Sequence, residues 1–488
     1  MTRVMLVNPP WYAFLGGSSP PPLGLISLAG SLKTAGHDVT IFNADIFGDL
    51  YASEHDMLLA CEDYRSRLSC LDAPIWKLVR ERLRLWEPDV VGVHVKTPSW
   101  FAGRMVARIA KDVLPNSMTV CGGPHVSCMP CDVRGSEFDF GICGEGELPF
   151  IRLLGTSSCE DRSMLPSVVS SKQGPPFDSK DDRAALTFVK DLDSLSFSGW
   201  DALADIDRHD KLDLGAIMTA RGCPFGCRYC ASHRTWERKV RYRSPENVVA
   251  EIDYLTGAYG VRYVKIQDDT FTVDSHRAAL ICDMMRKRKG IKWSCTTRAD
   301  CVDLELAKIM AASGCCHVSV GVESGVDRIL HLMGKGETVE SIRQGCACLK
   351  KAAIPFVAFV MIGFPSETEM EAQETLEFAV SLGADSLCGS VVTPYPGTSL
   401  YKWAVENGRV QATDYGDWRA YYHQSSAMGL WDVPSQQAKK AIEVWFKAIE
   451  DYNERPIRLI RRFIEKCRSD PAGTVHRAFS VLHGKLSR

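Results

Sequence analysis

The sequence lacks any apolar run of about 18 residues, the length that an α-helix needs to cross a bilayer, so we expect no membrane partner. The apolar part of residues 1–10 is too short for a signal peptide, and a buried strand explains this segment better. A large net charge is absent too, because 58 basic and 60 acidic residues leave a net charge of −2. That balance argues against a protein that coats nucleic acid or an anionic membrane.

The sequence also lacks the cysteine pattern of a small disulfide-bonded secreted domain, although it contains 19 cysteines. We therefore expect a cytoplasmic protein, since a reducing compartment suits so many thiols. No hydrolytic triad or catalytic pair of carboxylates is recognisable in the sequence. The 488 residues are 45% hydrophobic and 24% charged, which is typical of a globular protein with two or three domains.

One short segment, residues 221–230, holds three cysteines with the spacing C-x3-C-x2-C. They are Cys223, Cys227 and Cys230. Three thiolates on one loop can bind three irons of a [4Fe–4S] cluster, and the motif leaves the fourth iron open to a small molecule. The alternative is a zinc site, which would need a fourth ligand at tetrahedral spacing. His233 lies near enough in sequence to be that ligand.

Hydrophobic strands alternate with helical stretches over residues 1–150, a domain that we expect to be a doubly wound parallel sheet of the α/β class. The expected strands are residues 3–8, 37–42, 89–95, 118–121 and 138–143. Such sheets bind ligands at the carboxyl ends of their strands, where this sequence places loops rich in glycine and proline.

A second series of strands and helices occupies residues 209–400 and predicts a six-fold βα partial barrel. Its expected strands are residues 214–220, 261–267, 292–298, 317–323, 356–362 and 386–392. The site of a barrel lies at the carboxyl ends of its strands. Residues 151–208 are expected to be a linker, and residues 401–488 a helical C-terminal extension. Its tryptophans, Trp403, Trp418, Trp431 and Trp445, are more typical of a core than of a substrate cage.

The cysteine triplet resembles the cluster motif of radical S-adenosylmethionine (SAM) enzymes. The resemblance implies that the open iron binds SAM, and that one electron from an external donor such as flavodoxin or ferredoxin produces a 5′-deoxyadenosyl radical. It also implies SAM contacts at Tyr229 beside the adenine, Arg298 at the carboxylate and Glu323 at the ribose. The remaining implied contacts are Asp268 and Asp269 near the amino group, and Gly363. For each of these the alternative is a buried salt-bridge or capping residue.

Five motifs near the N-terminus resemble those of the cobalamin-binding domain of cobalamin-dependent radical SAM enzymes. They are Pro9-Pro10, Pro22-Leu-Gly-Leu25, Gly36-His-Asp-Val39, Gly122-Gly-Pro-His125 and Gly144-Glu-Gly-Glu147. The resemblance implies cobalamin contacts at Pro10, Leu23, Gly24, Thr97, Gly122, Gly123, Pro124, His125, Gly144, Glu145 and Gly146. The alternative is a flavodoxin-like domain that has lost its cofactor.

The D-x-H-x-x-G motif, which supplies a lower cobalt ligand in many cobalamin proteins, is missing here. Asp207-Arg-His209 begins like it, but Leu212 stands where the glycine is required. We therefore expect no protein imidazole below the cobalt.

The resemblance implies a methyltransferase that moves a methyl group from SAM, through methylcobalamin, to an unactivated carbon or phosphorus of a small-molecule substrate. A first alternative keeps both cofactors but performs a rearrangement or ring formation without methyl transfer. A second is a cobalamin sensor with an inactive barrel, against which the intact cysteine triplet argues. Methylthiolation of transfer RNA is a poorer match, because it would bring three more N-terminal cysteines and a basic RNA-binding tail.

Overall fold

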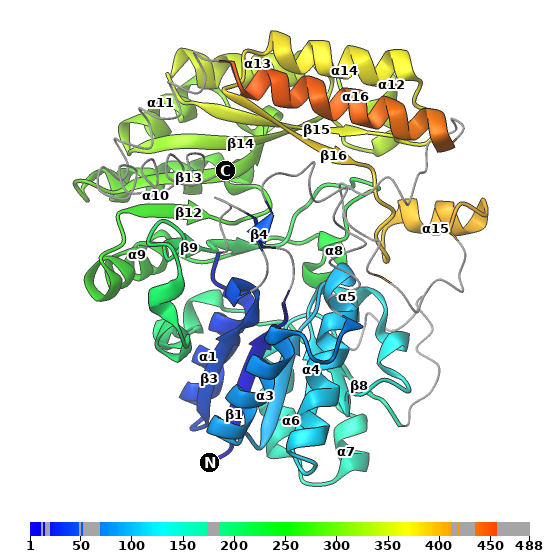
Figure 1. Ribbon diagram of the computed structural model, residues 1–488. Coiled ribbons are helices and arrows are strands. Elements are labelled where there is room, and N and C mark those ends of the chain that lie inside the picture. The colour runs from blue at the N-terminus through cyan, green and yellow to red at the C-terminus, as the bar shows by residue number, and fades with distance from the viewer. Residues whose placement is uncertain are drawn as a thin grey trace, which may run out of the picture. The chain divides into compact units, whose positions relative to one another are not determined.

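The computed structural model describes residues 1–10, 13–14, 20–47, 50–51, 69–172, 186–410, 418 and 435–455 (Figure 1). The chain divides into two compact units. The first contains residues 1–251, 333–336 and 391–430, and the second contains residues 252–332, 337–390 and 431–488. None of the helices in the described ranges is long and apolar enough to span a membrane.

The first unit is built on a six-stranded sheet with the strand order β3-β1-β5-β6-β7-β8. Its parallel strands are β1 (Arg3–Asn8), β3 (Asp38–Asn43), β5 (Val90–His94), β6 (Met118–Gly122) and β7 (Phe140–Ile142). The predicted doubly wound sheet is confirmed. The central residues of β1 and β5 are buried throughout, as expected for parallel strands that are covered on both faces.

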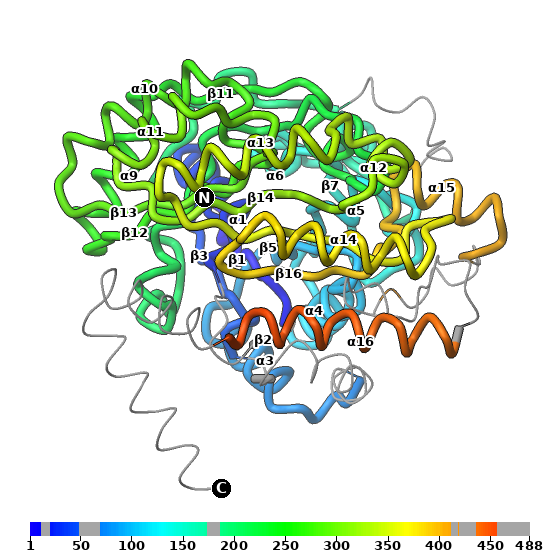
Figure 2. The backbone as a smooth tube through the Cα atoms, turned by 90° about the horizontal axis from the view of Figure 1, so that it is seen from above, coloured from blue at the N-terminus to red at the C-terminus, as the bar shows by residue number. Residues whose placement is uncertain are grey.

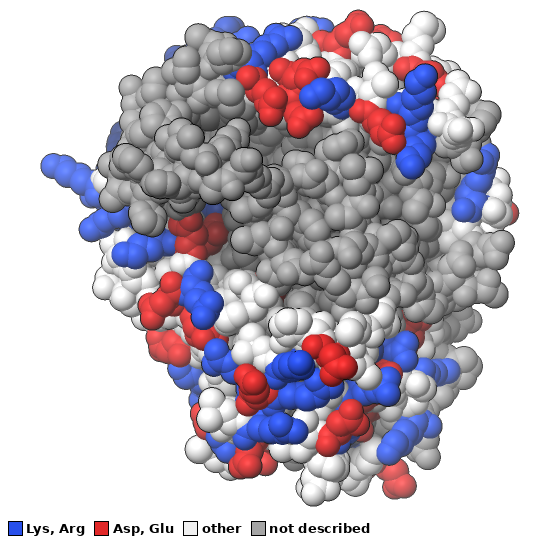
Figure 3. Space-filling view, viewed as in Figure 1, with Lys and Arg blue, Asp and Glu red and all other residues white. Residues whose placement is uncertain are grey.

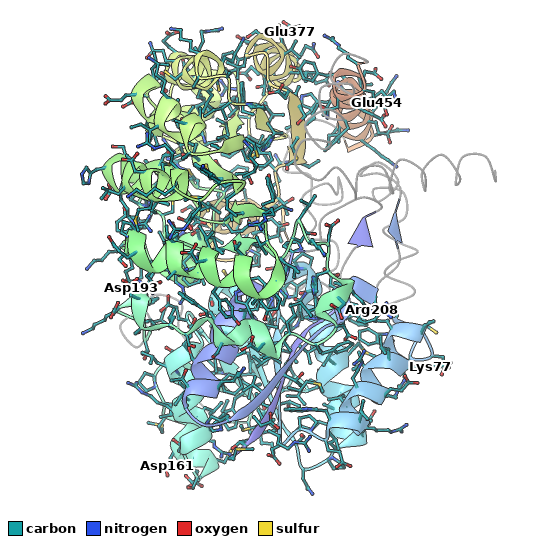
Figure 4. The ribbon with its side chains drawn as sticks, turned by 90° about the vertical axis from the view of Figure 1, so that its left-hand side faces the viewer. Lys77, Asp161, Asp193, Arg208, Glu377 and Glu454 are labelled. Carbon is teal, nitrogen blue, oxygen red and sulfur yellow. The ribbon has the colours of Figure 1, made fainter. Side chains whose placement is uncertain are left out.

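The helices of this unit connect successive strands around the sheet (Figure 1). They include α1 (Leu23–Thr34), α3 (Pro74–Trp86), α4 (Trp100–Val113) and α6 (Glu147–Gly155). Lys77 of α3 and Asp161 of the short helix α7 (Cys159–Ser163) lie on the outside of the unit (Figure 4).

The first sheet continues beyond residue 150, where the sequence predicts a linker. The strand β8 (Val168–Ser170) pairs antiparallel with β7 and is buried. Asp193, labelled in Figure 4, bonds the start of helix α9 (Pro245–Tyr259), because its carboxylate accepts the backbone N–H of Ser244 at 2.9 Å. The hydroxyl of Ser244 in turn caps the helix by accepting the N–H of Asn247 at 3.1 Å.

The second unit contains the strands β12 (Tyr263–Ile266), β13 (Lys292–Arg298), β14 (Cys315–Glu323) and β15 (Phe356–Ile362), which pair in parallel. The strand β16 (Ser386–Val391) lies beside β15. Helices separate the strands in sequence: α10 (Ser275–Arg286), α11 (Leu304–Ala312), α13 (Val339–Lys351) and α14 (Glu369–Ser381). The predicted series of βα units is therefore present.

One predicted strand is wrong. Residues 214–220 do not form a continuous strand but two short ones, β9 (Ala216–Ile217) and β10 (Ala220–Arg221). The chain breaks between them because β10 turns away to pair antiparallel with β11 (Arg241–Tyr242).

The C-terminal part of the chain is helical where it is described, in α15 (Ser399–Glu406) and α16 (Ser435–Asn453). The helix α16 lies alongside α14 in Figures 1 and 2, and the indole N–H of Trp445 donates to the carbonyl of Ala372 at 3.2 Å. Trp418 and Trp445 are buried, which confirms their core role, whereas Trp403 is partly exposed. Trp431 and residues 456–488 lie outside the described residues. Acidic and basic side chains are interspersed on the face seen in Figure 3.

Candidate functional site

The three cysteines of the motif lie in residues 222–240, a segment that includes the short helix α8 (Ser232–Trp236) and that we call the cluster loop. The strands β10 and β11 bracket it and pair with each other, with Arg221 opposite Arg241. The thiols of Cys223, Cys227 and Cys230 are all free of disulfide bonds and all partly exposed. Thiolates in that state can bind metal, so these residues fit the [4Fe–4S] cluster that their spacing predicts.

The backbone around Cys230 is turned toward its sulfur. The N–H of Ser232 lies 3.5 Å from the Cys230 Sγ atom, and the N–H of Cys230 donates to the carbonyl of Cys227 at 3.3 Å. An N–H group directed at sulfur, as that of Ser232 is, stabilises the negative charge of a thiolate ligand. Nδ1 of His233 contacts the Cys230 carbonyl at 3.2 Å.

The zinc alternative finds no support in this geometry. Across the described ranges, no three His, Cys, Asp or Glu side chains gather closely enough to hold one metal ion. A tetrahedral zinc site requires such a group, whereas an iron–sulfur cube spreads its thiolates over different irons.

Gly222 begins the cluster loop in a conformation that other residues rarely adopt. Its φ angle is +104°, and a Cβ atom at this position would overlap the carbonyl oxygen of Lys239 at the other end of the loop. The two ends of the loop therefore approach each other at a point where only hydrogen fits.

The middle of the cluster loop is fixed by backbone hydrogen bonds to two other segments of the chain. The N–H of Arg228 donates to the carbonyl of Met333 at 2.8 Å, and the carbonyl of Arg228 accepts from the N–H of Leu400 at 3.0 Å. Tyr229, the predicted adenine contact, follows directly and is partly exposed. Its role toward SAM stays a prediction.

Arg221 and Arg241, which flank the two ends of the cluster loop, form what we call its base. Buried charged residues join this base to the loop after β7. The carboxylate of Glu145 accepts hydrogen bonds from Arg221 at 3.0 Å and from Arg241 at 2.7 and 3.0 Å. Glu147 accepts from Arg221 at 2.7 Å and from the hydroxyl of Ser27 at 2.6 Å. Burial alone would raise the pKa of Glu147, but the Arg221 guanidinium holds that pKa below its usual range.

The predicted SAM contacts of the second unit follow successive parallel strands and so lie along one edge of their sheet. Asp268 is buried and Asp269 exposed after β12, and Glu323 ends β14. Glu323 has a φ angle of +66°, which is strained for a side chain larger than hydrogen. Strain of this kind is concentrated at functional sites, and it supports the prediction for Glu323.

Arg298 ends β13 with a buried guanidinium that is ion-paired. Its guanidinium donates to both carboxylate oxygens of Asp300 at 2.9 and 2.7 Å and lies 3.6 Å from Glu337. This geometry matches the salt-bridge alternative. Its contact with the SAM carboxylate stays a prediction.

Gly363 follows β15 with a φ angle of +90°, and the carboxylate of Glu367 holds the turn by accepting the N–H groups of Gly363 and Phe364 at 2.6 and 3.1 Å. Burial raises the pKa of Glu367 to about 7, although the two N–H donors act in the opposite direction. Glu367 was not among the residues predicted from the sequence, where nothing distinguishes it from a surface glutamate.

We expect Glu367 to make stability depend on pH. The pKa of Glu367 is higher in the folded chain than the ordinary value of 4.5. The contribution of this residue to the free energy of unfolding is therefore complete at low pH and is lost as the pH rises through 7. Between pH 6 and 8 the wild type should lose roughly 1 kcal/mol more unfolding free energy than a Glu367→Gln variant, which cannot ionise. Urea unfolding at both pH values measures the difference, and equal losses in the two proteins would contradict it.

The predicted cobalamin contacts border the carboxyl edge of the first sheet. Pro10 and Thr97 follow β1 and β5, and Leu23 and Gly24 begin α1. Gly122, Gly123, Pro124 and His125 lie at the end of β6, and Gly144, Glu145 and Gly146 follow β7. The glycines Gly123 and Gly144 have φ angles of +114° and +74°, so the backbone turns sharply at this edge.

His125 is fully buried, and both of its ring nitrogens have partners within the protein. Nδ1 lies 3.3 Å from the hydroxyl of Thr97, and Nε2 lies 3.1 Å from the carboxylate of Asp132, which also accepts from the indole of Trp418. Burial lowers the pKa of His125, although Asp132 acts in the opposite direction. The contact of His125 with cobalamin stays a prediction.

Two family comparisons agree with these two sites. Residues 16–154 match the B12-binding domain, and residues 217–379 match the radical SAM superfamily. An uncharacterized methyltransferase of Pyrococcus horikoshii, PH0819, is 30% identical over 473 residues, which are 95% of each chain. The anaerobic magnesium-protoporphyrin IX monomethyl ester cyclase of Cereibacter sphaeroides is 27% identical over 85% of this chain and 65% of its own.

The fold is also that of a solved structure. The radical SAM methyltransferase TsrM of Kitasatospora setae, with cobalamin and a [4Fe–4S] cluster bound, superposes with a TM-score of 0.60 at 17% identity over 83% of this chain and 78% of TsrM. The domain matches imply the three predicted cofactors, namely cobalamin, SAM and the cluster. The chain is therefore an enzyme of the radical SAM superfamily that carries an N-terminal B12-binding domain, and it belongs with the cobalamin-dependent methyltransferases of that superfamily.

Proposed function

We propose that this enzyme transfers a methyl group from SAM to an unactivated carbon or phosphorus atom of a small-molecule substrate. The observation that carries the proposal is the presence of two cofactor sites in one chain: a cysteine triplet without disulfide bonds and the sheet edge of a B12-binding domain. When bound, cobalamin supplies a methyl carrier, while SAM and the cluster supply a radical that removes hydrogen from an unreactive position.

The side chains of the protein bind and orient in this proposal, and none has to act as a base toward the substrate. The three thiolates would hold three irons and leave the fourth open for the amino and carboxylate groups of SAM. Tyr229 would lie against the adenine, and Glu323, in its strained conformation, would bind the ribose hydroxyls. SAM cleavage consumes one electron, for which an external donor such as flavodoxin or ferredoxin is part of the proposal.

The predicted cobalamin contacts include glycines in tight turns, notably Gly123 and Gly144, whose positive φ angles let the backbone turn sharply at the edge where the ligand would bind. The lower face of the cobalt would carry no protein imidazole, because the D-x-H-x-x-G motif is missing. In the cob(II)alamin form, a nitrogen splitting in the paramagnetic spectrum from a protein histidine would contradict this part of the proposal.

The experiment that tests methyl transfer uses SAM with a deuterated methyl group, a chemical reductant and candidate substrates from the pathway of neighbouring genes. Methyl transfer is expected to give a labelled product, with S-adenosylhomocysteine and 5′-deoxyadenosine each formed about once per product. Accumulation of 5′-deoxyadenosine with a product that gains no label would overturn methyl transfer and leave both cofactor sites standing.

A second candidate function is ring formation or rearrangement without net methyl transfer. The similarity to an anaerobic cyclase over 85% of this chain supports this candidate. The same assay separates the two, since a cyclase would consume SAM to form 5′-deoxyadenosine without a matching amount of S-adenosylhomocysteine.

A further inference from the structure

We propose that Glu145 positions the cluster loop and is not a cobalamin contact. Its carboxylate closes the base of the loop by bonding the arginines at both ends, and Glu147 connects one of them to α1. The proposal rests on the cluster assignment of the cysteine triplet, but not on the identity of the reaction.

The first observation is that the acceptor capacity of Glu145 is used within the protein. Oε1 accepts from Arg221 at 3.0 Å and from Arg241 at 2.7 Å, and Oε2 accepts from Arg241 at 3.0 Å and from the N–H of Val189 at 2.6 Å. A carboxylate has about four lone-pair sites, so these four bonds leave none for the amides of cobalamin. The side chain is also only 1% exposed.

The second observation is that the base of the loop needs an anion. The ribbon of β10 and β11 is two residue pairs long, and an isolated ribbon of this kind is marginally stable at best. Arg221 and Arg241 stand directly opposite each other across it, and like charges in that position repel. Both guanidinium groups are largely buried, so water cannot screen them. Glu145 lies between them and bonds to both.

Glu147 extends the same connection. It stands in the first turn of α6, where a negative charge is favoured by the helix dipole. It bonds Arg221 and Ser27, and Arg221 also donates to the Ser27 hydroxyl at 2.9 Å. Two carboxylates thus balance two guanidinium groups, and the motif Gly144-Glu-Gly-Glu147 ties the start of the cluster loop to the first sheet and its helix α1.

The hydrogen bonds of Arg221 affect the cluster because Arg221 lies very close in the chain to the first cysteine of the motif. Arg221 is separated from Cys223 only by Gly222, whose φ angle of +104° is set by close approach to Lys239. Movement of either arginine would therefore shift the first cysteine relative to the other two. If the base is loosened, iron should leave the cluster more easily. The effect of bound SAM on the spectrum of the cluster should change as well.

The test measures both cofactor sites in the reconstituted full-length enzyme without any substrate. Hydroxocobalamin titration gives the cobalamin Kd, and a ferrous chelator gives the rate of iron release. For Glu145→Gln and Glu147→Gln we expect iron release to be about tenfold faster, because a buried guanidinium loses its charged partner, and the cobalamin Kd to stay within about threefold of wild type. The paramagnetic spectrum of the reduced cluster should also respond differently to SAM.

The matched control is Glu251→Gln. Glu251 is a carboxylate of low exposure that pairs with Arg243 in the same unit, but its arginine does not border the cluster loop. Its iron release should match that of wild type. If Glu145→Gln does not fold, Arg241→Lys takes its place in the test. This variant keeps the positive charge but loses the bidentate hydrogen bond to Glu145, and it should release iron about threefold faster than wild type.

Three results would overturn the proposal. One is a cobalamin Kd raised more than about tenfold in Glu145→Gln with iron release as in wild type, which would make Glu145 a cobalamin contact. Another is no change in either measurement. The third is equal loss at both sites in Glu145→Gln and in Glu251→Gln, which would show general loosening. A wild-type enzyme that holds its cluster but transfers no methyl group would defeat the proposed function and leave this test intact.

Discussion

A variant with Cys223, Cys227 and Cys230 all changed to alanine is expected to hold no [4Fe–4S] cluster and to form no detectable 5′-deoxyadenosine from SAM. The three thiols are the ligands that the C-x3-C-x2-C motif offers to the irons, so their removal takes away all three predicted iron–sulfur bonds to the protein. Iron and sulfide content after anaerobic reconstitution measures the first loss, and chromatography of the SAM products measures the second.

The matched control for the triple variant is Cys159→Ala, which removes an exposed thiol of the same unit that stands outside the motif. It should bind iron and sulfide in the same amounts as wild type. Cobalamin binding should persist in both proteins, because the predicted cobalamin contacts lie on other segments. A full cluster in the triple variant would refute the assignment of these cysteines.

The second large effect is expected for Gly222→Ala. This change places a Cβ atom against the carbonyl of Lys239 and forces alanine into a φ angle of +104°. A residue in such a region costs about 1–3 kcal/mol before any overlap is counted, and the loop can relieve that cost by opening at its base. Most of the cluster should therefore be lost, with cobalamin binding largely kept, as iron analysis and hydroxocobalamin titration would show.

Gly226→Ala separates this effect from a general intolerance of the loop to alanine. Gly226 does not have a positive φ angle, and its added Cβ would meet only the end of the Arg238 side chain, at 2.8 Å, which can move aside. This variant should keep its cluster. If the two variants lost iron equally, the close approach of Gly222 to the Lys239 carbonyl would not be what keeps the loop closed.

Local features were predicted well from the sequence because their causes are local. The apolar run within residues 3–8 forms the centre of β1, and the alternation of strands and helices yields the α/β class with two sheets that are mostly parallel. Thr368 and Glu371 cap α14 through reciprocal hydrogen bonds between neighbours in the chain, so the start of that helix can also be predicted. The cysteine spacing belongs to one short loop and needs no knowledge of the rest of the fold.

Only the tertiary structure showed what Glu145 does. The sequence places it in a glycine-rich motif that resembles a cobalamin loop, but its partners Arg221 and Arg241 lie 76 and 96 residues further along the chain. Hydrogen bonds between such distant groups depend on how β7, β10 and β11 pack, and no spacing in the sequence encodes that packing. The break between β9 and β10 and the antiparallel strand β8 escaped prediction for a related reason. Each is decided by a pairing partner outside the strand's own local sequence, Tyr242 for Ala220 and Phe140 for Ser170.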